Sequence, residues 1–307
     1  MSPAFAAPGT SDVGLPAQNG GPSVGALKEV NAELTSALKR PTPEKLGAAI
    51  ASAQTTLGDI GTLGQGGQLS KQIKVTVALY YKALGTFLDV QTKRCKSRPL
   101  GEGLVTGQLI RGLSAGAKAA LGASSVRRFQ SRIVSCLGLH LSISSSVHNA
   151  DLGYNIGVNV EVPLAYNVAT GTYTGTGTIT KDFQSIESPG DCTSELTFTD
   201  GKFLVKKLEV PVDATSGAVS DVVLNEYIGG QTNESVTVTC PGPPEVKTVA
   251  PFVGWGLNFY WIHSKNANLV INGWDLTAGS PLATKHFTQS ATNMDEDSLL
   301  VLTRTAH

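Results

Sequence analysis

The sequence predicts an α+β protein: a small N-terminal helical bundle followed by an antiparallel β-sandwich or barrel of about ten strands. The first indication is periodicity. Apolar residues recur every three or four positions from Ser23 to Cys136, and every second position after Gly138. The second is charge. The chain is neutral overall, but residues 1–138 carry a net charge of +9 and residues 139–307 a net charge of −9. This asymmetry favours two parts with different surfaces.

Three segments follow from these observations. Residues 1–22 are rich in Pro, Gly and Ala without periodicity, and predict a disordered leader. Residues 23–138 predict a basic helical domain, and residues 139–307 an acidic antiparallel β-domain. Within the leader, Ala4–Ala6 has the A-x-A form of a signal-peptidase site. Both interpretations of this tripeptide, the remnant of a signal peptide and a chance match, stay open.

The predicted helices are marked by apolar stripes and by stop signals. Thr42 and Pro43 form a good helix start, as N-cap and first helical residue. Pro99 ends the clearest helix, where the cationic side chains that precede it suit the negative end of the helix dipole. The stripes predict helices within residues 24–38, 43–57, 69–94, 104–121 and 126–136.

The predicted strands alternate apolar and polar positions. The alternate threonines of Thr172–Thr180 predict the solvent face of a half-buried strand rather than a crystal-binding surface. Alternation predicts strands within residues 139–144, 155–162, 172–180, 196–210, 222–227, 235–240, 255–263, 269–276, 283–289 and 298–304.

The strongest local signal among the strands is Asp200-Gly201, a type I′ turn dipeptide. It predicts a two-residue hairpin that pairs Phe198 with Phe203 and Leu196 with Val205. The apolar positions change from odd to even after Lys206, which predicts a β-bulge near Lys206–Lys207.

Residues 255–276 hold all three tryptophans of the chain. On a strand, Trp255 and Trp261 lie on one face with other apolar residues, which favours burial in the core, with Tyr260 nearer the surface. The alternative is an aromatic surface that binds a carbohydrate or an apolar ligand. The candidate ligand-binding residues are Trp255, Tyr260, Trp261 and Trp274.

The four cysteines form no C-x-x-C motif, which argues against a zinc ribbon or a thioredoxin-like site. Pairing within each half predicts two disulfides, Cys95–Cys136 and Cys192–Cys240, and therefore a secreted, periplasmic or envelope location. Four buried free thiols are the alternative. No apolar run is long enough to predict a transmembrane helix.

A basic patch is predicted around the last helices. It can dock on the acidic β-domain of the same chain, which we favour, or bind an external anionic partner. The patch lacks interleaved aromatic residues, and the chain is neutral, so nucleic acid is not favoured. Its candidate residues are Lys93, Arg94, Lys96, Arg98, Arg127, Arg128 and Arg132.

No motif predicts a catalytic, metal or cofactor site. Gly112–Gly116 matches the G-x-S-x-G pattern of a nucleophile elbow, but the strand and parallel sheet that this motif requires are not predicted around it. Asn233 begins a glycosylation sequon, which matters only in a secretory eukaryote. The sequence therefore favours a non-enzymatic, extracytoplasmic binding or scaffold protein. The alternatives are a carbohydrate- or apolar-ligand-binding β-domain and a hydrolase with an unrecognised site.

Overall fold

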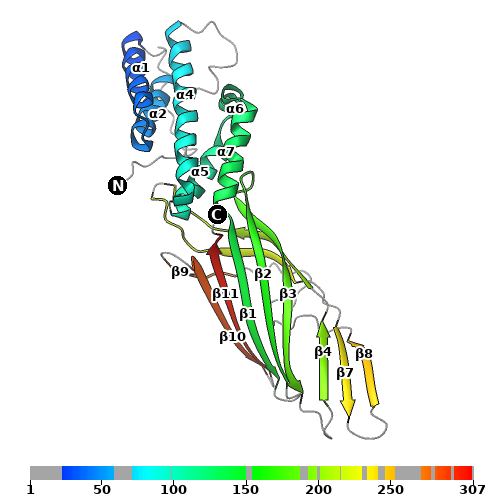
Figure 1. Ribbon diagram of the computed structural model, residues 1–307. Coiled ribbons are helices and arrows are strands. Elements are labelled where there is room, and N and C mark those ends of the chain that lie inside the picture. The colour runs from blue at the N-terminus through cyan, green and yellow to red at the C-terminus, as the bar shows by residue number, and fades with distance from the viewer. Residues whose placement is uncertain are drawn as a thin grey trace.

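Helices lie at one end of the molecule, and strands extend from them toward the other end (Figure 1). The computed structural model describes residues 23–58, 71–97, 99–149, 154–186, 193–198, 201–214, 216–229, 234–240, 246–252, 271–277, 281–291 and 294–305. The predicted leader and the segment 253–270 lie outside these residues. The α+β class predicted from the sequence is confirmed.

The described helices follow the predicted stripes closely. Ser23 begins the first helix, where its hydroxyl accepts a hydrogen bond of 3.1 Å from the backbone N–H of Ala26. Thr42 caps the second in the same way, with Pro43 as its first residue. The α-helices are α1 (Val24–Lys39), α2 (Pro43–Leu57), α4 (Lys71–Arg94), α5 (Leu100–Gly112), α6 (Ala115–Leu121) and α7 (Ala123–Cys136), and a 3₁₀ turn, η1 (Cys95–Ser97), follows α4.

The long helix α4 is the centre of the helical part. It packs against α1 and α2, and also against α5, α6 and α7. Its buried residues include Tyr80, Leu84 and Leu88, which lie four positions apart. Because helices pack on both sides of it, α4 needs the wide apolar stripe that its sequence predicts.

The single helix predicted within residues 104–121 is wrong. The chain instead forms α5 and α6, separated by Leu113 and Ser114. The Ser114 hydroxyl accepts a hydrogen bond of 3.3 Å from the backbone N–H of Ala117 and so caps α6. The serine of the G-x-S-x-G match therefore has a structural role at a helix start.

The strands form two antiparallel sheets. The larger has eight strands in the order β6-β5-β3-β2-β1-β11-β10-β9, and the smaller has the order β4-β7-β8. The strands are β1 (Leu139–Asn149), β2 (Tyr154–Asn167), β3 (Thr172–Ile186), β4 (Thr193–Phe198), β5 (Gly201–Glu209), β6 (Val223–Gly229), β7 (Glu234–Cys240), β8 (Val246–Phe252), β9 (Asp275–Leu276), β10 (Ala283–Ala291) and β11 (Met294–Arg304).

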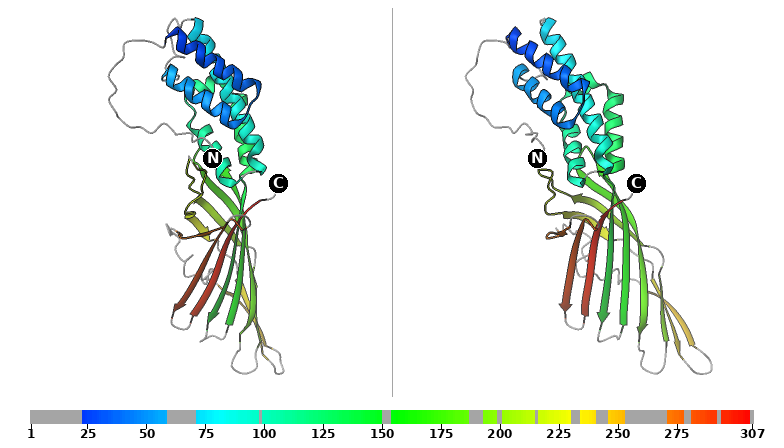
Figure 2. Two further views of the ribbon diagram at one scale, coloured as in Figure 1. Left: turned by 90° about the vertical axis from the view of Figure 1, so that its left-hand side faces the viewer. Right: turned by 60° about the vertical axis from the view of Figure 1, so that its left-hand side comes forward.

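The eight-stranded sheet curls into a half-barrel, so the ten-stranded sandwich is not confirmed (Figure 2). Two glycines of β3 explain the curl. A Cβ atom at Gly175 would lie 2.2 Å from the carbonyl oxygen of Pro163, and one at Gly177 would lie 2.1 Å from that of Glu161. Glycine therefore lets β2 and β3 approach closely. The curl brings Ile271 to Leu224 of β6, with two backbone hydrogen bonds of 3.1 and 3.3 Å.

The hairpin predicted at Asp200-Gly201 is wrong, because the two strands belong to different sheets. β4 pairs with β7, whereas β5 pairs with β3 and β6. Phe203 and Val205 are fully buried in the larger sheet. Burial of these side chains outweighs the preference of a two-residue turn. The predicted bulge is confirmed, since the register of β5 against β6 shifts at Lys207.

Solvent exposure along β1 follows the predicted alternation, and so does that of β3 from Thr174 onward. The prediction is wrong for Thr172, which is buried and whose hydroxyl shares a hydrogen bond of 2.7 Å with that of Thr170. Thr174, Thr176, Thr178 and Thr180 are exposed, and the residues between them are buried or half-buried. β8 has no counterpart in the predicted strands. The predicted strand at residues 255–263 lies outside the described residues, and only Asp275 and Leu276 of the predicted strand 269–276 form a strand, β9.

Helices and sheet share one hydrophobic core across the change of secondary structure at Gly138. Ile110, Leu137, Leu139 and Tyr166 all belong to it, and a Cβ atom at Gly107 of α5 would lie 2.9 Å from the Tyr166 ring. Glycine thus allows a helix to pack directly on the end of the sheet. The division into two domains at this point stays a prediction.

Candidate functional site

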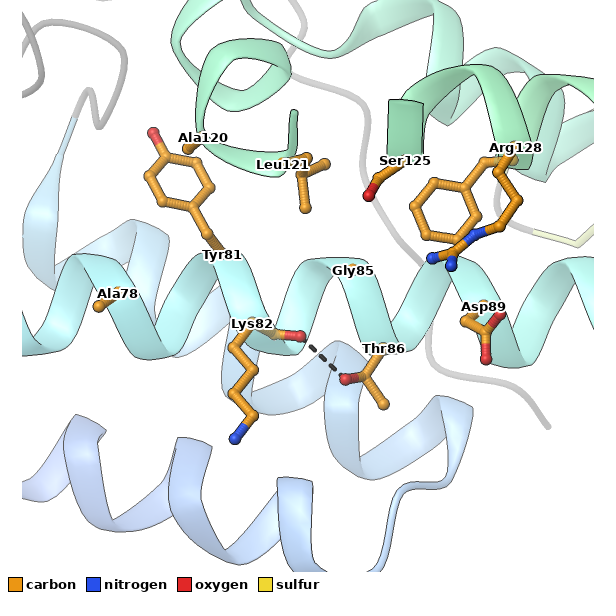
Figure 3. Close-up of a pocket in the computed structure, with 11 residues that line it drawn as sticks. Ala78, Tyr81, Lys82, Gly85, Thr86, Asp89, Ala120, Leu121, Ser125 and Arg128 are labelled. Carbon is orange, nitrogen blue, oxygen red and sulfur yellow. Dashed lines mark hydrogen bonds between the residues drawn. The ribbon is translucent and has the colours of Figure 1, made fainter. Parts of the chain in front are cut away.

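A groove of about 680 Å³ runs along α4, on the side covered by α6 and α7 (Figure 3). Helix α4 forms one wall, and the start of α7 with the end of α6 forms the other. The lining residues are Ala78, Tyr81, Lys82, Gly85, Thr86, Asp89, Ala120, Leu121, Ser125, Arg128 and Phe129.

The floor of the groove is apolar. Phe129 is 2% exposed, and Leu121 packs partly buried against the same core. Gly85 brings α6 close to α4, since a Cβ atom there would lie 3.2 Å from Leu121 Cδ2. Tyr81 adds an aromatic wall, and its ring meets that of Tyr80 edge-on with centroids 5.3 Å apart. Burial raises the pKa of Tyr81, so its phenol stays neutral and available as a hydrogen-bond donor.

The rim of the groove is cationic. The Arg128 guanidinium lies 5.1 Å from the centroid of the Phe129 ring and is exposed. This cation–π contact holds the charge at the edge of the apolar floor. Arg127, the preceding residue, is also exposed.

One carboxylate, Asp89, lies within this cationic surface. It forms ion pairs with Lys93, at 2.9 Å, and with Arg132. The hydrogen bond from Lys93, followed by that from Arg132, holds the pKa of Asp89 below its usual value. Asp89 is therefore ionised at neutral pH and offsets one of its two cationic partners, so the surface keeps a net positive charge.

The structure brings the basic patch together at the junction of α4, η1 and α7. Lys93 and Arg94 end α4, Lys96 lies in η1, and Arg127, Arg128 and Arg132 follow one another along α7. Arg98 lies outside the described residues. Sequence reasoning missed Asp89 because the charge run was counted from Lys93. The available signal was the i, i+4 spacing of Asp89 and Lys93 on α4.

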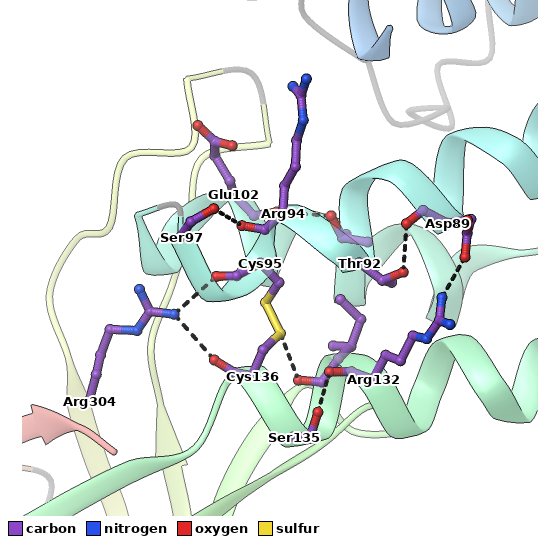
Figure 4. Close-up of a disulfide and its surroundings, with 12 residues drawn as sticks. Asp89, Thr92, Arg94, Cys95, Ser97, Glu102, Arg132, Ser135, Cys136 and Arg304 are labelled. Atoms are coloured by element: carbon purple, nitrogen blue, oxygen red, sulfur yellow. Dashed lines mark hydrogen bonds and ion pairs between the residues drawn. A yellow bond between two sulfur atoms is a disulfide. The ribbon is translucent and has the colours of Figure 1, made fainter. Parts of the chain in front are cut away.

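The Cys95–Cys136 disulfide is confirmed and clamps this junction (Figure 4). It joins η1 to the end of α7 across 41 residues, with Cα atoms 5.9 Å apart. Both cysteines are buried. Cys192 lies outside the described residues, so the Cys192–Cys240 pairing stays a prediction.

Two arginines outside the predicted patch form hydrogen bonds between the helical part and the β-part of the chain. Arg304 of β11 donates to the carbonyl oxygens of Cys95 and Cys136, both at 3.2 Å. Arg111 of α5 donates to the carbonyl oxygen of Thr170 at 2.9 Å. Within the patch, Lys93 and Arg132 pair with Asp89, and Lys96, Arg127 and Arg128 are exposed. Both interpretations of the patch, docking on the β-domain of the same chain and binding of an external anionic partner, stay predictions.

The aromatic candidates divide into two groups. Trp274 is 4% exposed, and its indole N–H donates to the carbonyl oxygen of Ile271 at 3.2 Å. This residue therefore belongs to the core inside the curled sheet. Trp255, Tyr260 and Trp261 lie outside the described residues, and both the core and the ligand-binding interpretation of them stay predictions.

A second depression, of about 450 Å³, lies on the outer face of the larger sheet. It contains a histidine–carboxylate pair, in which His286 Nε2 lies 2.5 Å from Asp297 Oδ1. Ser144 and Ser146 of β1 line the same depression. The His286 and Asp297 side chains are 56% and 65% exposed, so water screens their charges. This geometry differs from the desolvated pairs that activate a serine nucleophile.

Among the described residues, no group of three or more His, Cys, Asp or Glu side chains is arranged to hold a metal ion. In the same part of the chain, no helix combines the length and the apolar character needed to cross a membrane. Comparison of the chain with family models, with curated proteins and with solved structures finds no match.

Proposed function

We propose that this chain is an extracytoplasmic, non-enzymatic binding or scaffold protein that holds an anionic partner in the groove between α4 and α6–α7. The observation that carries the proposal is the position of Arg128. Its guanidinium is exposed at the edge of a groove whose floor contains Leu121 and Phe129. A partner that presents a carboxylate or sulfate beside an apolar group matches both features.

Charge supports the same conclusion. Asp89 is shared between Lys93 and Arg132, which leaves the charges of Arg127 and Arg128 without a counterion in that cluster. Exposed cations attract an anionic partner over roughly one Debye length, about 10 Å at 0.1 M salt. Binding should therefore be faster and tighter at low ionic strength.

The disulfide supports the proposed compartment. Cys95 and Cys136 are bonded, and disulfides persist mainly in secreted, periplasmic and cell-surface proteins. A rigid clamp at the end of α4 and α7 also preorganises the groove, so less conformational entropy is lost when a partner binds.

Heparin is a suitable polyanionic probe for the groove. Isothermal titration at low and high salt should show binding to the wild type that weakens as salt is added. Arg128→Gln should weaken binding several-fold. Lys28→Gln is the matched control, because it also removes one exposed charge. Lys28 lies on α1, which packs against α4 but does not line the groove.

Two results would contradict the proposal. One is wild-type binding to heparin that Arg128→Gln leaves unchanged. The other is an equal loss from Lys28→Gln, which would show attraction to net charge alone rather than to the groove.

A further inference from the structure

Asp297 of β11 and Arg128 of α7 lie too far apart to neutralise each other within one molecule. Arg304 lies seven positions after Asp297 along the strand, and Cys136 lies eight positions after Arg128 along the helix. At about 3.3 Å per strand residue and 1.5 Å per helix residue, Asp297 and Arg128 lie roughly 35 Å apart. Helix α7 and strand β11 extend in opposite directions from the junction of the helices and the sheet (Figure 1). Such a separation exceeds the Debye length at about 0.1 M salt several-fold, so Asp297 does not neutralise Arg128 of the same molecule.

We propose that the occupant of the groove is a second copy of this chain. It places Asp295, Asp297 and Leu299 against the groove, and these residues of β11 are called the hairpin end. This inference rests on the proposed function, because it names the anionic partner of the same groove. The chain supplies both halves of the contact: a net charge of +9 over residues 1–138 and of −9 over residues 139–307.

The hairpin end has the chemistry that the groove requires. β10 ends at Ala291, which pairs with Met294 at the start of β11. Asp295, Asp297 and Leu299 then alternate along β11 on its outer face, and all three are exposed. Leu299 is 41% exposed, which is unusual for a leucine in this molecule. Two carboxylates and one apolar side chain thus form a row with about 6.7 Å between neighbours.

The groove provides the complementary set. Arg128 can pair with a carboxylate of the partner, and Leu121 and Phe129 can pack against its apolar side chain. Asp297 already accepts a hydrogen bond from His286. A carboxylate has about four acceptor positions, so Asp297 can also accept from a guanidinium of the partner.

The symmetry of this contact determines the kind of assembly. The groove and the hairpin end are different surfaces, so the contact is heterologous, and each copy keeps one unused groove or hairpin end. Copies therefore join head to tail into chains or rings. The contact is electrostatic and exposed, so assembly should be weak and should decrease with salt.

Charge reversal tests the inference in the full chain. Sedimentation velocity of the wild type, over a range of concentrations at about 0.02 M salt, should show self-association that about 0.5 M salt abolishes. Arg128→Glu and Asp297→Lys should each raise the apparent dissociation constant about tenfold or more. Lys28→Glu on α1 is the control for net charge and should have little effect. Near-UV circular dichroism verifies that each variant is folded.

An equimolar mixture of Arg128→Glu and Asp297→Lys gives the decisive measurement. In each contact between the two variants the opposite charges are restored, either as the original pair or as the exchanged pair. The mixture should therefore associate as the wild type does, although neither variant associates alone.

Each alternative outcome overturns the inference. A wild type that stays monomeric at low salt excludes the second copy as occupant, and heparin binding to that same monomer would leave the proposed function intact. Association that Arg128→Glu weakens but Asp297→Lys does not would show that another surface fills the groove. Loss of both self-association and heparin binding would overturn both proposals.

Discussion

Ser145 of β1 and Ser298 of β11 lie directly opposite each other on neighbouring strands of the larger sheet. Their hydroxyl groups share a hydrogen bond, with 2.6 Å between the two oxygen atoms. Ser298 also donates to Glu296 at 2.7 Å. A hydroxyl has one proton, so Ser145 must be the donor to Ser298. All three side chains are buried, which makes this chain of hydrogen bonds a polar element inside an apolar core.

Ser298→Ala should destabilise the protein by about 1–3 kcal/mol, because Ser145 and Glu296 each lose a hydrogen-bond partner in a buried site. The free energy of unfolding in urea measures this loss. Ser144→Ala is the matched control, since Ser144 is the adjacent residue of β1 and is exposed. Equal stability of the two variants would mean that the buried hydroxyls contribute nothing.

Gly177→Ala should destabilise the sheet by about 1–3 kcal/mol or more, since the added methyl group forces β2 and β3 apart. The reason is the 2.1 Å approach of a Cβ atom to the Glu161 carbonyl oxygen. Gly112→Ala is the control, because nothing lies within 4 Å of a Cβ atom there. That control should be neutral or slightly stabilising, so a similar loss in both variants would contradict the explanation given for the curl.

Replacing Cys95 and Cys136 together by alanine should cost about 3–4 kcal/mol in the chain-entropy model for a loop of this length. Thermal unfolding with and without a reducing agent measures the effect. Non-reducing peptide mapping of the intact protein then tests both predicted pairs. A peptide that links Cys95 to Cys192 or Cys240 would contradict the pairing within each half.

Asp89 should contribute stability at neutral pH that is lost in acid. Its pKa is held low in the folded state by Lys93 and then Arg132. The contribution is therefore complete above the unfolded value of about 3.9 and decreases as the pH falls through the lower folded value. Asp89→Asn should remove up to about 1 kcal/mol of this contribution.

Urea unfolding between about pH 7 and pH 2.5 tests this effect, with Glu29→Gln on α1 as the control. The wild type should lose more stability than Asp89→Asn over the acid range. Parallel curves for the two proteins would show that the ion pairs of Asp89 do not contribute to stability.

Local sequence signals were sufficient for most helices and for most strands. Ser23, Thr42 and Pro43 act where their side chains predict, because caps depend on neighbouring residues only. The Cys95–Cys136 pair was also predicted correctly, from position within the same half.

Non-local contacts determine the features that the sequence did not predict. Asp200-Gly201 predicts a hairpin locally, yet Phe203 is buried against strands that lie far away in sequence. The groove was missed because its walls, around Gly85 and Arg128, come from two helices that only tertiary packing brings together. The alternation of Gly175 and Gly177 was visible in the sequence, but its effect depends on the position of the β2 backbone.

The position of β1 has a mechanical consequence. β1 begins three residues after α7 ends, and it pairs along its full length with β2 and β11. Antiparallel hydrogen bonds lie perpendicular to the strands, so tension along the long axis of the molecule loads many of them in shear at once. A sheet loaded in this direction resists extension far better than one pulled open from its edge, one bond after another.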